Sequence, residues 1–409
     1  MNDIFLIPSP EAFENSRLTV DFGLRTALLK HRTAVVPCIG SVRFLRQMTW
    51  SLAAIYLCTE YFDERTRRSK RISATAVANA IEALACKAMY DYASRDTFAY
   101  YGSRVFGREC TDGVFEKRDK WTFAWLSQTK NYVQNTYRQS ASAAIYALKL
   151  TEGSSRFNSM RLTQEGRSIA LEFLQQKIDE KALISYLTSW IRNTQKVLPA
   201  NSSTWKKFLN SLNPKRQTTT ERNLYTRVFN NKVRYNGRQI LLPLMKVCNT
   251  EKDLLDSLER SNEVRYRTEI LAAKAFDDFH NAVKILFSGC IGLMDSNIFR
   301  LKDIEGKLQT EIALVKAKGE TYLKFKEFAY GNATVGAMIR SKFKDMLDLI
   351  ISNNKAILVK TDMVMKGPLY VAAKDWASEQ NNSKDNDNEW PLSRLRQWRN
   401  LCIDCGVCR

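Results

Sequence analysis

Three cysteines near the end of the chain have the spacing of a metal site. Cys402, Cys405 and Cys408 are separated by two residues each, which suits thiolate ligation of zinc or an iron–sulfur cluster. Three ligands do not close a structural site, so a fourth would come from a distant cysteine, His280 or the terminal carboxylate. The same cysteines fit a packed tail without metal. We expect no cofactor, and zinc at these three cysteines is the alternative.

The segment DIEGK at 303–307 has the residue types of a metal-dependent nuclease. Glu305 and Lys307, with Asp295 or Asp303 as the second carboxylate, would hold Mg²⁺ and activate a water molecule. The surrounding sequence has helical periodicity and alternating charges, which is typical of a solvated helix face. A metal-dependent nuclease is therefore an alternative function, and we expect that the chain is not an enzyme.

The two histidines give no support to a catalytic site. His31 lies between Lys30 and Arg32, which favours a surface or phosphate-contacting position. His280 lies in a helical pattern beside two aspartates and is interpreted as a packed or surface residue. The sequence has no glycine-rich phosphate loop and no nucleophile elbow. Binding is therefore a better expectation than catalysis.

Charge is the strongest functional signal in the 409 residues, whose formal net charge is +20. An excess of this size indicates a polyanionic partner, with nucleic acid ahead of an anionic membrane surface. Eleven basic residues fall between 192 and 238, opposed only by Glu221. They are Arg192, Lys196, Lys206, Lys207, Lys215, Arg216, Arg222, Arg227, Lys232, Arg234 and Arg238. Such density repels itself without a partner, so we expect these cations to contact phosphates.

Aromatic residues are interleaved with these cations. They are Trp205, Phe208, Tyr225, Phe229 and Tyr235. Aromatic rings at such positions either stack on unpaired bases or anchor the segment to the core. We favour anchoring for the rings and phosphate contact for the charges.

Residues 121–174 are expected to form the elements that position a binding surface. A helix should run from about Thr136 to Leu150, with Ala144, Ile145 and Leu148 buried. Its exposed side chains would be Arg138, Gln139, Ser142 and Lys149. Two short strands follow, with Arg156 at the tip and Arg161 on the return strand. Thr163 then caps a helix that continues to about Thr194.

The end of this stretch resembles winged-helix DNA-binding domains. The residues that carry the resemblance are Leu162, Thr163, Glu165, Gly166 and Arg167. In that family a recognition helix is followed by a two-stranded wing that closes in a similar phrase. The resemblance implies that the helix at 136–150 and its hairpin contact nucleic acid. Many winged helices join proteins instead, so a structural adaptor is the other alternative.

A second resemblance concerns residues 22–57, FGLRTALLKHRTAVVPCIGSVRFLRQMTWSLAAIYL. This phrase is similar to a turn and an arginine–aromatic helix in uncharacterised proteins encoded beside bacterial restriction and antiviral genes. It implies a subunit of a prokaryotic DNA-defence or DNA-processing complex, in which other subunits supply catalysis. It supplies no catalytic residue.

Together these patterns predict a mainly α, multidomain helical protein with an embedded winged-helix module. The predicted ranges are 1–120 (helical), 121–195 (winged helix), 196–240 (basic segment), 241–377 (helical) and 378–409 (linker and cysteine tail). The most apolar segment, 50–58, is too short to cross a bilayer, and the N-terminus has no signal-peptide pattern. We expect a cytoplasmic protein without a membrane partner that binds nucleic acid, preferably duplex DNA, and other subunits.

Overall fold

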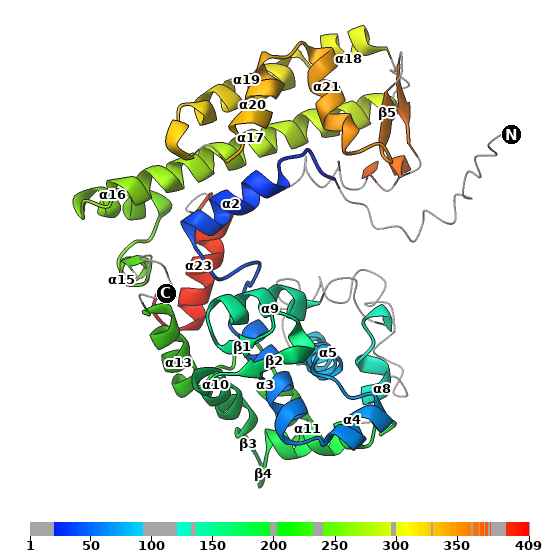
Figure 1. The fold of residues 1–409 in the computed structure, drawn as a ribbon, viewed down its shortest axis with the longest axis vertical. Coiled ribbons are helices and arrows are strands. Elements are labelled where there is room, and N and C mark those ends of the chain that lie inside the picture. The colour runs from blue at the N-terminus through cyan, green and yellow to red at the C-terminus, as the bar shows by residue number, and fades with distance from the viewer. Residues whose placement is uncertain are drawn as a thin grey trace, which may run out of the picture. The chain divides into compact units, whose positions relative to one another are not determined.

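The computed structural model describes residues 20–92, 121–131, 136–196, 203–231, 240–295, 300–328, 330–360, 363–367, 369–371, 373–374, 377 and 390–408. Over these residues the chain is mainly helical, as predicted, and its strands form short two-stranded hairpins (Figure 1).

No single helix among the described residues is both long and apolar enough to cross a bilayer. One pair, Glu64–Lys70 with Ala74–Met89, passes that test only when the two helices are counted together across a 63° bend.

The chain forms two compact units. Unit 1 contains Met1–Val35 and Thr250–Ser393, and unit 2 contains Val36–Asn249 and Arg394–Arg409. These units differ from the five ranges predicted from sequence. Residues 36–120 share unit 2 with the ranges 121–195 and 196–240, because helices from all three stretches pack on each other. Residues 1–35 belong to unit 1, and the ranges 241–377 and 378–409 are each divided between the units.

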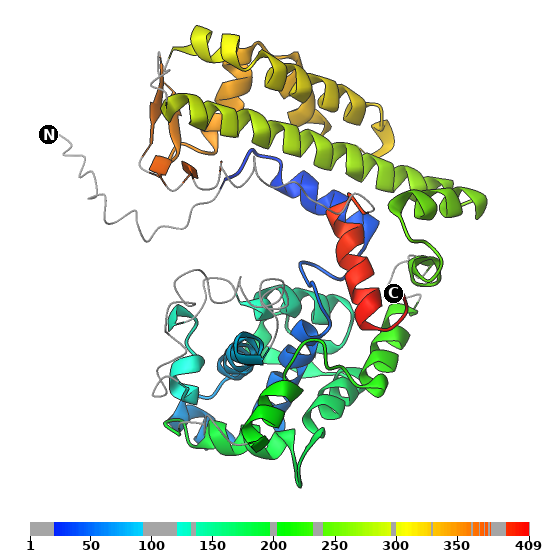
Figure 2. The ribbon, with the colours of Figure 1, turned by 180° about the vertical axis from the view of Figure 1, so that it is seen from behind.

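Unit 1 is built around one long helix, α17 (Val264–Asp295), which packs against α2 and α19 (Figure 2). The other elements of this unit are α2 (Arg25–Val35), α16 (Glu251–Arg260), α18 (Leu301–Lys307), α19 (Gln309–Leu323), η5 (Lys326–Phe328), α20 (Asn332–Arg340), α21 (Phe343–Ser352), β5 (Leu358–Lys360) and β6 (Val364–Lys366). Thr250 begins α16 with a capping box, in which its hydroxyl accepts the Asp253 amide at 3.1 Å. Strands β5 and β6 pair as an antiparallel hairpin.

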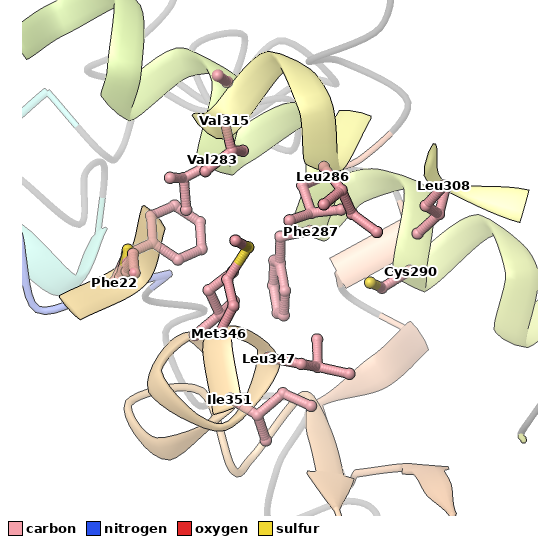
Figure 3. Close-up of a cluster of buried hydrophobic side chains, with 14 of the residues drawn as sticks. Phe22, Val283, Leu286, Phe287, Cys290, Leu308, Val315, Met346, Leu347 and Ile351 are labelled. Atoms are coloured by element: carbon pink, nitrogen blue, oxygen red, sulfur yellow. The ribbon is translucent and has the colours of Figure 1, made fainter. Parts of the chain in front are cut away.

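The core of unit 1 joins segments that are far apart in the sequence. Figure 3 shows Phe22, Phe287 and Met346 converging from three such segments. Phe22 and Phe287 meet edge to face, with ring centroids 5.5 Å apart. Burial of these apolar side chains is the main stabilising contribution to the unit.

Unit 2 surrounds α3 (Arg46–Glu60), in which thirteen of fifteen residues are buried. Helices α5, α9 and α10 pack directly on α3. The elements of this unit are α3, α4 (Glu64–Lys70), α5 (Ala74–Tyr92), α8 (Phe123–Leu126), η2 (Thr129–Asn131), α9 (Tyr137–Ala147), β1 (Thr151–Gly153), η3 (Phe157–Ser159), β2 (Met160–Leu162), α10 (Gln164–Leu174), β3 (Lys177–Ile178), β4 (Lys181–Ala182), α11 (Leu183–Arg192), α12 (Ser203–Ser211), α13 (Thr219–Phe229) and α15 (Leu241–Met245). Helix α23 (Ser393–Asp404) adds the C-terminal residues.

One expectation for the helices of unit 2 is wrong. The helix expected to continue from Thr163 to about Thr194 is interrupted by the hairpin β3–β4, whose turn places Asp179 at a φ of +55°. The basic stretch 65–71 lies largely in helix α4, which Asp63 caps. The basic segment 196–240 contains α12 and α13.

Candidate nucleic-acid interface

Helix α9 begins where the sequence predicted and buries the predicted face. The Thr136 hydroxyl accepts the Gln139 amide at 3.3 Å, which satisfies a free N–H group of the first turn. Ala144, Ile145 and Leu148 are fully buried. This apolar stripe packs against α3, and it leaves the opposite face of α9 exposed.

The hairpin β1–β2 confirms the two short strands expected after α9. Its antiparallel register pairs Glu152 with Arg161, and both side chains are exposed. Arg156 is exposed in the connection between the strands. Cross-strand neighbours of opposite charge stabilise a hairpin modestly. The local order of helix, hairpin and helix is therefore the one expected of a winged helix, although such a module is defined by more than this order.

The residues of the winged-helix-like phrase close this hairpin against α10. The Thr163 amide donates to the Leu150 carbonyl at 3.1 Å, and its hydroxyl caps the Gly166 amide at 3.3 Å. Gly166 is required because a Cβ atom at this position would collide with the Leu150 carbonyl oxygen. The threonine and the glycine are thus explained by the close approach of two backbone segments.

Arg138 does not have the exposed position predicted for it. Its Nε atom donates to Asn79 Oδ1 at 3.2 Å, and its guanidinium lies over the Phe157 ring at 5.4 Å. It is half-buried and links α9 to α5 and to the hairpin connection. Arg138 is therefore a structural cation here, because its donor groups already have partners within the unit.

A buried carboxylate supports the same end of α9. Glu82 on α5 accepts the Arg138 amide through Oε2 at 3.1 Å. Burial raises the pKa of Glu82 to about 8, against the opposing effect of these amide donors. Its Oε1 atom has no hydrogen-bond partner among the described residues. The N-terminus of α9 is therefore held by the carboxyl group of Glu82, whose ionisation is unfavourable because it is buried.

The exposed cations on and beside the hairpin form one part of the candidate interface. We call Lys149, Arg156 and Arg161 the hairpin cations; all three are exposed. Lys149 adopts a φ of +54°, and its carbonyl accepts the Thr163 hydroxyl at 3.1 Å. Gln139 is exposed and Ser142 is half-buried on the adjacent helix. Four of the six positions predicted on α9 and the hairpin are thus exposed, and Arg138 is the one that is engaged inside the unit.

Helix α4 adds cations that the sequence reasoning did not assign to the site. We call Arg65, Arg68, Lys70 and Arg71 the α4 cluster; all four are exposed. Asn158 in the hairpin connection accepts the Thr75 amide at 2.9 Å, so the hairpin is tied to the start of α5, directly after this cluster. Lys70 also donates to the Arg192 carbonyl at the end of α11. Only the density of basic residues at 65–71 could have indicated the cluster.

The basic segment contributes a further set of exposed cations and buried rings. Trp205, Phe208, Tyr225 and Phe229 are buried, so the anchoring interpretation is confirmed for these four, and Tyr235 lies outside the described residues. Arg192, Lys196, Lys206, Lys207, Lys215, Arg216 and Arg227 are exposed. Lys232, Arg234 and Arg238 also lie outside the described residues.

Some of these cations are partly used within unit 2. Lys207 pairs with Asp179 at the turn of the β3–β4 hairpin. Arg222 is half-buried, and its Nε atom is buried without a hydrogen-bond partner among the described residues. Arg227 lines a shallow groove between α10 and α13. The segment is therefore an ordered pair of helices with cations on its outer side.

A fully buried arginine holds this segment in place. Arg46 on α3 pairs with Glu221 on α13 at 3.0 Å and donates to the Ser211 carbonyl at 3.1 Å. The Thr49 hydroxyl donates to Glu221 at 2.7 Å. Glu221, the one acidic residue in the basic segment, is thus a core residue and does not neutralise the surface. Sequence reasoning missed Arg46 because its partner is distant in the chain.

The cysteine tail is packed into unit 2. Cys402 and Cys405 are buried, Cys408 is half-buried, and every cysteine of the described part of the chain is a free thiol. The described residues contain no group of three His, Cys, Asp or Glu side chains arranged to hold a metal ion. Beside them, burial raises the pKa of Asp404 to about 7, and Asp404 accepts the Leu45 amide at 2.9 Å. Zinc at these cysteines stays the alternative to the expectation of no cofactor.

The remaining candidate chemistry lies in unit 1. His31 is buried rather than exposed, stacks on Phe276 at 4.9 Å, and contacts the Tyr322 hydroxyl at 3.0 Å. Burial lowers the pKa of His31 to about 4 and that of His280 to about 3. The DIEGK motif lies on the short helix α18. Asp303 and Glu305 are two residues apart there and so face different directions.

The charge of the chain is concentrated in one unit. Unit 2 contains 38 Lys and Arg residues against 17 Asp and Glu, whereas unit 1 contains 25 against 26. The hairpin, α4 and the basic segment all belong to unit 2. The excess of cations therefore lies in the unit that contains the hairpin and the basic segment expected to bind, together with α4.

No family model, curated protein or solved structure matches this chain. Its function has to be inferred from the charge and geometry of its own residues.

Proposed function

We propose that unit 2 binds nucleic acid, with duplex DNA as the preferred partner, and catalyses no reaction on it. Helix α9 and the hairpin β1–β2 act as a winged-helix module that orients the partner. The hairpin cations, the α4 cluster and the outer side of α12 and α13 contact phosphates. The observation that carries the proposal is the concentration of the whole cation excess in this unit.

Electrostatics supports a polyanion as the partner. Lys149, Arg156 and Arg161 have no ion-pair partner within hydrogen-bonding distance among the described residues. Cations that neutralise phosphates release condensed counterions, and this gives affinity without sequence information. A surface of this kind on several rigid elements suits an extended phosphate backbone better than a small anion.

The biological setting follows from the resemblance of residues 22–57 to proteins encoded beside bacterial restriction and antiviral genes. In that setting the chain is a subunit of a prokaryotic DNA-defence or DNA-processing complex in the cytoplasm. Other subunits would carry out the reaction, and this chain would bind the nucleic acid.

Binding measured at two salt concentrations tests the proposal. Fluorescence anisotropy with a labelled duplex, a single strand and an RNA of the same length should give the tightest binding for the duplex. Affinity should fall steeply with added salt, by about 0.9 in log K per log unit of salt for each phosphate contact. Association with an apolar protein partner that is insensitive to salt, together with no nucleic-acid binding, would instead establish the adaptor function.

A further inference from the structure

The outward face of α9 has an unusual composition for a helix that reads base edges. Gln139, Ala143 and Tyr146 form a line along the exposed side, with Ser142 and Ala147 on its flanks. Sequence readout in the major groove uses arginine, lysine, asparagine or glutamine side chains aimed at the bases. Gln139 is the one side chain of this kind on the stripe, because Arg138 is bonded to Asn79.

Tyr146 is the large side chain of this stripe. It is 41% exposed. Its ring has no aromatic or cation–π partner among the described residues. The other exposed tyrosines in the described part of the chain differ, because Tyr61 packs on Tyr56 with ring centroids 6.0 Å apart and Tyr330 packs on His31 at 5.0 Å. An aromatic ring left open on a charged binding surface is available to a flat partner.

The neighbours of Tyr146 leave space for such a partner and supply the matching charge. Ala143 and Ala147 are exposed and end at Cβ, so a planar group can approach the ring without steric obstruction from them. Lys149 is exposed three residues later, at a backbone position held by the Thr163 hydroxyl. Aromatic rings combined with nearby cations are the arrangement with which proteins hold unpaired bases and their phosphates.

We infer that the Tyr146 ring stacks on an unpaired base, so that unit 2 prefers duplexes that contain an unpaired base or a single-strand junction. The inference rests on the proposed function and adds its substrate class. The hairpin cations and the α4 cluster hold the paired arm through its phosphates. Tyr146 contributes discrimination between structures and not between sequences, because every base has a π-face.

The test uses the full chain and three labelled probes: a paired duplex, the same duplex with two unpaired adenines, and the single strand. Wild-type protein should bind the duplex with unpaired adenines most tightly. Tyr146→Ala should weaken that binding about tenfold and change binding to the paired duplex less than about twofold, since the stacked base is lost and the phosphate contacts remain. Tyr146→Phe should keep the preference, because the ring remains.

Two further measurements separate stacking from a structural role. A 2-aminopurine at the unpaired position should lose fluorescence on binding wild-type protein and not on binding Tyr146→Ala. Leu29→Ala, at an exposed helical position in unit 1, is the matched control and should change nothing. Circular dichroism should show the same helix content for all variants.

The outcomes also separate this inference from the proposed function. Wild-type protein that binds every probe with no preference for unpaired adenines contradicts the role of Tyr146 and leaves nucleic-acid binding intact. Equal losses for Tyr146→Ala on all three probes also contradict it. Wild-type protein that binds none of the probes overturns both proposals.

Discussion

The two units of this chain use charge in opposite ways. Unit 1 is nearly neutral, and an exposed pair such as Lys318–Asp278, with an N–O distance of 3.1 Å, is typical of it. Unit 2 places an arginine and a glutamate in its core and leaves cations on its surface. The net charge of the whole chain therefore understates the charge of unit 2, which we propose to bind nucleic acid.

The largest expected effect comes from the buried ion pair of unit 2. Arg46→Met leaves Glu221 uncompensated in the core and should lower the free energy of unfolding of unit 2 by about 3–5 kcal/mol. Six of the eight tryptophans lie in unit 2, so tryptophan fluorescence during urea unfolding reports mainly on this unit.

The matched change in unit 1 is Lys318→Met. The Lys318–Asp278 pair is exposed by about two fifths on each side chain, so its loss should cost roughly 0–1 kcal/mol. The double variant Arg46→Met with Glu221→Gln should recover part of the stability lost in Arg46→Met. Similar losses for Arg46→Met and Lys318→Met would show that the core pair of unit 2 is not special.

The second prediction concerns where the cations lie. Reversing Arg68, Arg71 and Arg156 to glutamate in unit 2 should weaken duplex binding about 100-fold at low salt, because phosphate contacts are lost and repulsion is added. The log–log salt dependence should become shallower by about 2.7, or 0.9 for each lost contact. Anisotropy titrations at several salt concentrations measure both quantities.

An equal charge change in unit 1 is the control. Lys302, Lys307 and Lys326 are exposed there, and their reversal to glutamate changes the net charge by the same amount. This variant should bind duplex within about threefold of wild type, since these lysines belong to none of the elements proposed to contact phosphates and salt screens the general effect of net charge. If both triple variants lose the same affinity, total charge and not its location determines binding.

Alanine substitutions at two glycines should have opposite effects on stability. Gly166→Ala forces a methyl group against the Leu150 carbonyl and should destabilise unit 2 by about 2 kcal/mol. Because the strain falls where the hairpin closes, duplex affinity should fall as well. Gly306 in α18 has open space around it, so Gly306→Ala should stabilise its helix by about 0.5–1 kcal/mol. Thermal unfolding followed by circular dichroism compares the stabilities of the two variants. If Gly166→Ala unfolds at the same temperature as wild type, the hairpin can shift to make room for the methyl group.

The smallest expected effect is a pH dependence. The pKa of Glu82 is raised to about 8 in the folded state, above its ordinary value of about 4.5. Between these values the folded protein retains a proton that the unfolded chain has lost, so unit 2 loses stability as pH rises. Glu82→Gln should reduce this loss by on the order of 1 kcal/mol between pH 6 and pH 8.

Asp404, with a pKa raised to about 7, contributes a loss in the same direction. The difference between wild type and Glu82→Gln isolates Glu82, because Asp404 is present in both. Glu180→Gln, at an exposed position in the β3–β4 turn, is the control and should follow wild type. Parallel urea midpoints for wild type and Glu82→Gln across this range would contradict the prediction.

Local signals in the sequence predicted the elements around the candidate interface. Thr136 and Thr163 each cap a helix, and the apolar residues of α9 recur with helical spacing, so the helix, hairpin and following helix were recognisable. Gly166 was part of a recognised phrase, but its contact with Leu150 requires the folded backbone. These features depend on residues close together in the chain.

Long-range features could not be predicted in this way. Arg138 was expected to be exposed, and nothing in the sequence marks Arg46 as buried, yet each has partners on distant helices. Their burial depends on acceptors such as Glu221 and Asn79, and no local pattern indicates those pairings. The residues of α4 are mostly charged and show no apolar stripe, so periodicity does not indicate this helix. The assignment of all these elements to one unit likewise depends on packing and not on composition.

The discontinuous course of unit 1 has a consequence for synthesis of the protein. Helix α2 leaves the ribosome early, but its packing partner α17 follows only after Val36–Asn249 has been made. At roughly 5–20 residues per second, translation of that insertion takes about 10–40 s. During this interval the apolar side of α2, including Ala27 and Val35, is not yet covered by α17. A chaperone that captures nascent chains should therefore bind α2 in arrested chains that stop before residue 264, and release it once α17 has emerged.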